Sequence, residues 1–241
     1  MTDYRQDLFD IYERHAMSEG AASESVLESR RPYFDHIIQR HFPADKRSRI
    51  WDLGCGYGAL LHRLKNRGYS DLSGIDASPK MVQEAVRLGL SVKEGQLLEA
   101  LHVKESGSVD VLCMMDVLEH LRKEEAIAVG HEVARVLAPG GRWIVHVPNG
   151  DAPFFGRVFY GDLTHETAFT RSSLAQLSEL LGFSSIECFE DKPVVHGAKS
   201  AVRSILWKGI RGALRVYLAA ETGSGRSDVI LSQNLLAVFF K

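Results

Sequence analysis

Cysteine, long apolar runs and an export signal are scarce or absent in this chain of 241 residues. The three cysteines, Cys55, Cys113 and Cys188, are odd in number and widely spaced, which excludes a disulfide framework and favours a reducing compartment. No run approaches the roughly 18 uninterrupted apolar residues of a membrane span. The first residues lack a charged and then apolar pattern, so we expect a cytoplasmic protein, soluble or peripheral to a membrane.

An excess of charge of one sign is missing as well. The formal net charge is −2, which gives no general attraction to nucleic acid, and we expect no nucleic-acid partner. The residues are 45% apolar and 25% charged, a composition typical of a globular α/β domain. Single cores stop growing near ~250 residues, so we expect one domain with an elaboration.

The spacing of apolar residues changes along the chain and predicts three parts. Residues 1–48 show helical spacing and are expected to form an N-terminal helical cap. In residues 49–190 short apolar strands, the first from Ile50, alternate with helices, which predicts a doubly wound parallel sheet. Residues 191–241 are expected to hold a basic amphipathic helix and a final strand. The other expected strands are 72–76, 91–94, 109–115, 143–147, 184–190 and 234–240, and the expected core helices are 59–66, 79–88, 123–137 and 172–181.

A glycine-rich loop follows the first expected strand. It reads Asp52-Leu53-Gly54-Cys55-Gly56-Tyr57-Gly58 and leads into a helix. Because glycine has no Cβ and tolerates positive φ, backbone N–H groups and the amino end of the helix can approach a ligand closely. Gly54, Gly56 and Ala59 also fit the G-x-G-x-x-G/A dinucleotide fingerprint, with Asp76 at the distance of a ribose-binding acid. The loop alone leaves a nicotinamide dinucleotide open as the ligand.

Three segments together resemble the class I S-adenosylmethionine-dependent methyltransferases. Asp52, two positions before Gly54, resembles the start of the family's motif I, where a dinucleotide site has an apolar residue. Residues 110–121, DVLCMMDVLEHL, resemble the family's fourth strand and following turn, and residues 137–145, LAPGGRWIV, its turn into the fifth strand. The resemblance implies a Rossmann-like seven-stranded sheet, parallel with an antiparallel last strand and with helices on both faces. It also implies S-adenosylmethionine as the cofactor.

The resemblance further implies roles for single residues. Asp76 accepts both ribose hydroxyls, Asp52 lies near the methionine moiety, and Met81 and Leu97 sandwich the adenine. Gln96 stands where the family places an Asp for the adenine amino group, and its carbonyl can accept in the same way. The full set of expected cofactor-binding residues is Asp52, Gly54, Gly56, Gly58, Asp76, Ala77, Met81, Gln96, Leu97, Met115 and Asp116.

The acceptor end is expected in the loop after the fifth strand, which contains His165. Its surroundings resemble a segment of methyltransferases from polysaccharide and small-metabolite pathways. A hydroxyl acceptor needs a general base, and histidine titrates near neutrality, so His165 is the expected catalytic residue. The alternative is that His165 pins the loop by hydrogen bonds. His120 and His146 are expected to be structural, and no metal site is expected because no cluster has ligand spacing.

The expected activity is methyl transfer to a small-molecule acceptor, above all to oxygen on a sugar or glycan precursor in polysaccharide biosynthesis. One fold hosts many acceptors, so three alternatives stay open. They are methylation of a quinone-like or other metabolite, an NAD-dependent oxidoreductase, and a non-catalytic S-adenosylmethionine-binding regulator.

The helix expected over residues 198–218 combines a basic stripe with an apolar face. Lys199, Arg203, Arg211 and Arg215 share the stripe at helical spacing. The favoured interpretation is that the apolar face packs on the domain or across a homodimer while the charges are solvated. The alternative is that the helix lies on an anionic membrane or grips a phosphorylated or lipid-linked acceptor.

Overall fold

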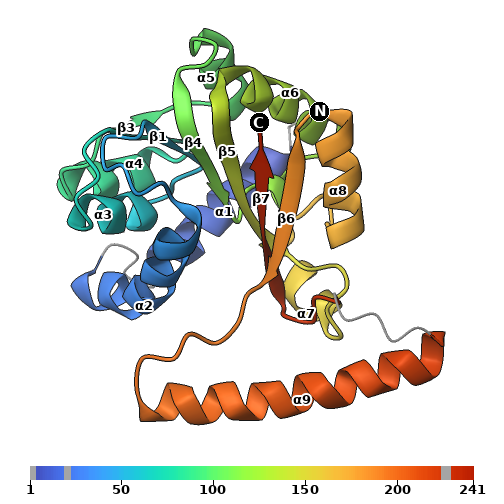
Figure 1. Cartoon of the computed structure of the whole chain (residues 1–241). Helices are drawn as coiled ribbons and strands as arrows, with labels where there is room; N and C mark the ends of the chain where they lie inside the picture. The colour runs from blue at the N-terminus through green and yellow to red at the C-terminus, as the bar shows by residue number, and fades with distance from the viewer. Residues whose placement is uncertain (1–3, 19–22, 224–228) are drawn as a thin grey trace.

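A seven-stranded sheet in the order β3-β2-β1-β4-β5-β7-β6 forms the centre of the computed structural model, which describes residues 4–18, 23–223 and 229–241 (Figure 1). Strands β1 to β5 pair in parallel, and β7 runs antiparallel to both β5 and β6. This confirms the expected fold class, including the antiparallel last strand. The strands are β1 (Ile50–Leu53), β2 (Leu72–Asp76), β3 (Val92–Glu94), β4 (Val109–Met115), β5 (Leu137–Pro148), β6 (Ser185–Glu190) and β7 (Asn234–Phe240).

Helices cover both faces of the sheet (Figure 1). Most of them match the expected ranges to within a residue or two, whereas the short α5, η1 and α7 were not expected, because a single helical turn or two gives too few residues for the apolar period to stand out. The helices are α1 (Tyr4–Ser18), α2 (Glu24–His41), α3 (Ala59–Asn66), α4 (Pro79–Arg87), α5 (Leu97–Val103), the 3₁₀ turn η1 (Leu118–His120), α6 (Lys123–Val136), α7 (Phe155–Phe159), α8 (Arg171–Leu180) and α9 (Ala198–Thr222).

Successive side chains of the strands point to opposite faces of the sheet and pack into two separate hydrophobic cores. In β5, Trp143 and Val145 pack on the face covered by α5, α6 and α8, whereas Ile144 packs on the face covered by α2, α3 and α4. His146 follows the same alternation and lies on the α2 face. Both cores are continuous and apolar, as a sheet buried on both faces requires.

Parallel pairing brings the functional ends of the strands to one edge. Asp52 lies in β1, Asp76 ends β2, Asp116 directly follows β4, and His146 is near the end of β5. Because the carboxyl ends of parallel strands meet at one edge of a sheet, these four side chains from distant parts of the chain become neighbours. The edge is the one at the bottom of Figure 1.

Helix α9 corrects the favoured interpretation of residues 198–218. Within α9, Ser200 alone is buried, while Ile205 is 67% exposed and Val216 is 71% exposed. The side that meets the domain carries Arg211, whose Nε lies 2.7 Å from Glu190. The apolar face therefore does not pack on its own domain, and the side that does so carries Arg211 with its acidic partner. Packing of the apolar face across a homodimer stays a prediction.

Asn149 locks the end of β5 to the segment before β7. It is fully buried, and its Nδ2 donates to the carbonyl oxygens of Ile230 and Ser232 at 2.9 Å each, while its Oδ1 accepts from the Asp151 N–H at 3.1 Å. One side chain thus satisfies three backbone groups that no strand pairing reaches.

We predict that Asn149→Ala lowers the free energy of unfolding by roughly 2–4 kcal/mol, because it leaves buried carbonyl groups without donors. Urea unfolding followed by circular dichroism measures the change. Ser184→Ala is the matched control, since it removes a side-chain hydrogen bond that is exposed and should cost about 0.5 kcal/mol or less. Equal losses in the two variants would contradict the locking role of Asn149.

Candidate functional site

A cleft of about 1850 Å³ opens at the carboxyl edge of the sheet. The glycine loop, the ends of β1, β2 and β4, and side chains of α1 and α2 line it. The cleft therefore combines a wall of backbone and acids from the sheet with a wall of helical side chains that precede the sheet in sequence.

Two glycines of the loop that line the cleft have positive φ. Gly54 has φ +70°, and a Cβ there would lie 2.5 Å from Val117 Cγ2. Gly56 has φ +54°, and its N–H donates to Asp76 Oδ2 at 2.7 Å. The left-handed conformation turns the loop tightly enough for a ligand to approach its backbone.

Asp76 is held between the glycine loop and the start of α4. Its Oδ2 accepts from Gly56, and its Oδ1 accepts from the Ser78 N–H at 2.9 Å. Ser78 in turn caps α4 by accepting from the Met81 N–H at 3.1 Å. The carboxylate is thereby oriented at the cleft before any ligand arrives.

Asp52 is a buried carboxyl group whose Oδ1 has no hydrogen-bond partner among the described residues. It is only 2% exposed. Burial, together with the charge of Asp76, raises its pKa to about 8. Two acids thus face the glycine loop with one oxygen still unsatisfied, a setting that favours a ligand with a positively charged donor group.

The expected cofactor-binding residues gather in this cleft with one exception. Gly58 is not among the described residues that line it; it begins α3 with φ +80°, and a Cβ there would lie 2.4 Å from Leu90 Cδ1. Its glycine is explained by close packing against Leu90 and by its positive φ. The expected residues that line the cleft are Asp52, Gly54, Gly56, Asp76, Ala77, Met81, Gln96, Leu97, Met115 and Asp116.

A network of charges occupies the cleft beyond β4 and β5. His146 Nδ1 lies 2.6 Å from Asp116 Oδ1, and His146 Nε2 lies 3.4 Å from Asp191 Oδ2. Burial lowers the pKa of His146, but the two carboxylates outweigh it and raise this pKa to about 10. Burial raises the pKa of Asp116, but the charge of His146 outweighs it and holds this pKa below its usual value.

The backbone of Asp116 is strained. Its φ of 57° is the one positive φ outside glycine among the described residues, which costs on the order of 1–3 kcal/mol. The N–H of Asp116 donates to the His146 carbonyl at 2.9 Å. The pairing with His146 thus maintains a conformation that directs the Asp116 carboxylate into the cleft.

Helix α2 supplies two further side chains at this end. Tyr33 lies edge-on to His146, with ring centroids 6.0 Å apart, and burial and the charge of Asp191 raise the pKa of its hydroxyl. The Arg30 guanidinium carbon lies 5.9 Å from the centroid of the Tyr57 ring. Both line the cleft, so the region before the sheet contributes directly to the site.

His165 lies behind His120 and is not among the described residues that line the cleft. The ring centroids of the two histidines are 4.8 Å apart. His165 Nδ1 lies 2.8 Å from the Phe159 carbonyl oxygen, which can only accept, so Nδ1 carries the proton and pins the loop. The catalytic role expected for His165 stays a prediction.

His120 lines the cleft and belongs to a short hydrogen-bond chain. The Thr164 hydroxyl donates to Asp162 Oδ1 at 2.6 Å and lies 2.8 Å from His120 Nδ1. Since that hydroxyl has one proton and gives it to Asp162, His120 Nδ1 must donate, which makes Nε2 the unprotonated nitrogen. Burial and the neighbouring His165 lower the pKa of His120.

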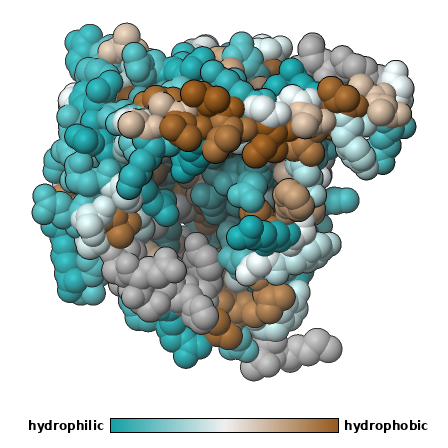
Figure 2. Space-filling model, turned by 90° about the horizontal axis from the view of Figure 1, so that it is seen from below, coloured by the Kyte–Doolittle hydropathy of each residue, from teal (hydrophilic) through white to brown (hydrophobic). Residues whose placement is uncertain are grey.

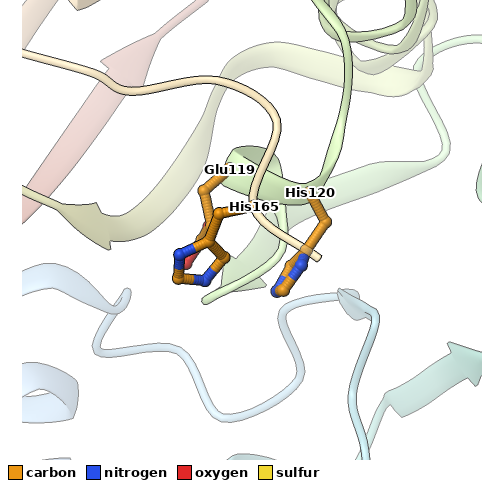
Figure 3. Close-up of side chains that lie close together, drawn as sticks. All are labelled: Glu119, His120 and His165. Carbon is orange, nitrogen blue, oxygen red and sulfur yellow. The ribbon is translucent and has the colours of Figure 1, made fainter. Parts of the chain in front are cut away.

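Glu119, His120 and His165 form a cluster that the sequence analysis did not anticipate (Figure 3). One potential ligand atom from each lies within 4.8 Å of the others. Burial and the charge of Asp116 raise the pKa of Glu119 well above its ordinary value, and its Oε2 has no hydrogen-bond partner among the described residues. A divalent cation is the kind of group such a set can hold. Ligand spacing did not reveal it because His165 is far from Glu119 in sequence.

Comparison with known proteins is consistent with this geometry. Residues 50–141 match the family model described as a methyltransferase domain. This segment is therefore similar to methyltransferase domains, in agreement with the resemblance to the class I S-adenosylmethionine-dependent methyltransferases. The glycine loop and both acids that face it lie inside the matched segment.

Two curated relatives match this chain over less than half of its length. A ubiquinone biosynthesis O-methyltransferase of Cupriavidus pinatubonensis is 34% identical over 106 residues, covering 42% of this chain and 41% of the relative. Another protein with that name, from Xanthomonas oryzae pv. oryzae, is 32% identical over 119 residues, covering 47% of this chain and 48% of the relative. The matches thus span less than half the length of these relatives.

Solved methyltransferase structures share the fold over most of the chain. A SAM-dependent methyltransferase from Archaeoglobus fulgidus superposes with a TM-score of 0.67 at 17% identity, covering 91% of this chain and 100% of that chain. Haemonchus contortus phosphoethanolamine N-methyltransferase 2 in complex with S-adenosyl-L-methionine gives a TM-score of 0.59 at 16% identity, covering 86% and 51%. At this identity the likeness is one of fold.

Sequence reasoning did not place four residues at the cleft that line it in the structure. His146 was expected to be structural, and Tyr33, Arg30 and Asp191 were not assigned to the site. A usable signal existed for His146: it is a titratable residue near the carboxyl end of a parallel strand, where side chains of the sheet meet the cleft. Asp191 had no such signal, because it lies after β6 and reaches the cleft only through the fold.

We predict that Asp76→Asn weakens the binding of S-adenosylhomocysteine roughly 10- to 100-fold, since it removes charge-assisted hydrogen bonds. Isothermal titration calorimetry measures the dissociation constant, and thermal unfolding checks that the fold is intact. Asp71→Asn is the matched control, because Asp71 is an exposed acid just before β2. Unchanged affinity in Asp76→Asn would refute the assignment.

We also predict a pH dependence of stability that depends on His146. Its folded pKa of about 10 lies above the ordinary value, so the stabilisation is complete below about pH 6.5 and is lost as the pH rises toward 10. The free energy of unfolding of the wild type should therefore fall more steeply between about pH 7 and pH 10 than that of His146→Gln. Urea unfolding at several pH values measures both slopes, and equal slopes would contradict the charged pair.

Proposed function

We propose that this protein transfers a methyl group from S-adenosylmethionine to a hydroxyl oxygen of a small-molecule acceptor. The observation that carries the proposal is the unsatisfied, buried carboxyl group of Asp52 beside Asp76 in the methyltransferase domain. The donor carries an ammonium and a sulfonium group, which suit such a site. A dinucleotide would instead bring a pyrophosphate to the loop, where Asp52 and Asp76 offer no positive charge to it.

The cleft residues divide the binding of the donor among them. Asp76 would accept the ribose hydroxyls, Asp52 would face the ammonium group, and Met81 and Leu97 would contact the faces of the adenine. Gln96 would accept from the adenine amino group. When bound, the donor supplies an electrophilic methyl group, and the chain's own task is to align the acceptor and exclude water.

The acceptor hydroxyl needs a group that removes its proton, and His120 has the suitable geometry. It lines the cleft, its Nε2 is the unprotonated nitrogen, and its pKa is lowered. His120 Nε2 would accept the proton of the hydroxyl whose oxygen takes the methyl group, so the products would be a methyl ether and S-adenosylhomocysteine. His165 would hold the loop that positions His120, and Asp116, fixed by His146, would orient the hydroxyl.

Two acceptor classes fit the site. The relatives named as ubiquinone biosynthesis O-methyltransferases favour a phenolic hydroxyl on a quinone-like precursor, and the ring of Phe9, 5.8 Å from that of His120, offers an aromatic wall. A sugar or glycan precursor is the second candidate, because the carboxylates of Asp116 and Asp191 suit neighbouring hydroxyls. Contact with a membrane, the alternative for residues 198–218, would accompany a lipid-linked acceptor of either class.

The donor is tested by thermal unfolding with S-adenosylhomocysteine and, separately, with NAD. A ligand at about 100-fold its dissociation constant stabilises the fold by about 2.7 kcal/mol, so a shift with the first compound alone is expected. Homocysteine release with catechols and with nucleotide sugars then separates the two acceptor classes. A protein that binds S-adenosylhomocysteine but turns over no acceptor would support the regulator instead.

We predict that His120→Ala lowers kcat by about 10²- to 10⁴-fold, as expected for the loss of a general base. His165→Ala should lose less, because a positioning contact is weakened rather than the proton acceptor removed. Both variants should bind S-adenosylhomocysteine normally, which controls for folding. If His165→Ala lost kcat while His120→Ala kept it, the base would be His165.

A further inference from the structure

Helix α9 presents an apolar face to solvent. The six large apolar residues of this face are each more than half exposed and recur at spacings of one helical turn, so they share one side of the helix. They are Val202, Ile205, Leu206, Ile210, Val216 and Tyr217. Viewed from below the molecule, hydrophobic side chains form a band along α9 (Figure 2). A band of this kind on a protein surface marks an interaction site.

Positive charge borders this face. Residues 192–220 contain no acidic residue, although the whole chain has a formal net charge of −2. Lys199, Arg203 and Lys208 are exposed on α9, while Arg211 is paired with Glu190 on the side toward the domain. The exposed surface of α9 is therefore apolar in the middle and cationic at its margins.

This helix lies at the same end of the molecule as the cleft (Figure 1). A second hollow of about 560 Å³ lies between α2, the segment after β6 and α9, where Arg203 and Trp207 line it. Tyr33, Asp191 and Asn234 line both this hollow and the cleft. The surface of α9 thus adjoins the acceptor end of the site.

The positive charges at the margins of the apolar face of α9 favour one kind of partner over another. A second copy of the chain would bring two cation-bordered faces together, whereas an anionic lipid surface offers both an apolar layer and negative charge. No helix in the described part of the chain is long and apolar enough to cross a membrane. The helix of 25 residues would instead lie in the membrane interface.

We propose that α9 docks this protein on an anionic membrane surface and that the second hollow admits an acceptor carried by a lipid. The acceptor half of this inference rests on the proposed function, whereas the docking half does not. On the membrane, the cleft would face the layer from which a long-chain acceptor emerges.

Docking is tested with the full chain and vesicles of phosphatidylcholine, with or without phosphatidylglycerol. We expect the protein to co-sediment at least tenfold more strongly with the anionic vesicles. The double variant Ile205→Ser and Ile210→Ser should lose at least tenfold of this binding, and Arg203→Gln should lose roughly fivefold. Val103→Ser is the control, because it removes an even more exposed apolar residue on α5, away from the apolar face of α9.

The docking proposal is overturned if the wild-type protein does not bind anionic vesicles. It is also overturned if the double variant binds them as well as the wild type does. A concentration-dependent dimer that the double variant abolishes, without vesicle binding, would assign the face to a second copy. Thermal shifts with S-adenosylhomocysteine show whether each variant keeps the donor site.

The acceptor half is tested with a hexadecyl catechol in anionic vesicles and with soluble 4-methylcatechol. We expect the double variant to lose turnover of the first and to keep turnover of the second. Equal turnover of the vesicle-borne catechol by wild type and double variant would refute lipid delivery. If neither catechol is turned over while vesicle binding persists, the phenolic acceptor fails and the docking stands.

Discussion

Parallel pairing of β1 with β2 and β4 is the constraint on which the site depends. Ile50 pairs with Leu72 on one side and with Val111 on the other, so all three strands run the same way and end at one edge. Each of them brings an acid to that edge or just beyond it, which gathers carboxyl groups in a partly buried cleft. Among the described residues, Asp52 Oδ1 has no hydrogen-bond partner. A cationic ligand would supply the missing partner, which is how the arrangement of the sheet favours a sulfonium donor.

At the end of the cleft beside β5, the acids are neutralised by a cation of the chain itself. His146, buried in β5, is held protonated between Asp116 and Asp191, and it fixes a strained backbone at Asp116. The strain is sustained because the pairing partner is itself anchored in β5, an interior strand of the sheet. Both ends of the cleft therefore present carboxyl groups at strand ends. At the end beside β5 the positive charge comes from His146, and at the glycine loop the proposed donor would supply it.

Helix α9 extends this arrangement beyond the domain. Its inward side is attached by Arg211 to Glu190 at the end of β6, next to Asp191 of the charge network. The same short segment thus joins the helix to the acceptor end. The proposed docking surface and a residue that lines the cleft are thus joined by one short segment.

The sequence by itself determined the alternation of strands and helices, the glycine loop and the residues facing it. These features are local: the period of apolar residues, the need for positive φ at Gly54 and Gly56, and an acid at a fixed distance from them are all written in contiguous segments. Most of the expected donor-side residues line the cleft for that reason.

Only the tertiary structure decided the acceptor side. Tyr33, Asp116, His146 and Asp191 come from four separate elements, and no spacing in the sequence relates them. His165 matched a local pattern, yet its place behind His120 follows from how the loop packs on η1. The outward direction of the apolar face of α9 was likewise undetermined, because amphipathic spacing defines two faces but not which one meets the domain. In the structure, the side of α9 that carries Arg211 faces the domain and forms an ion pair with Glu190. The spacing of residues in the sequence does not show such a pairing.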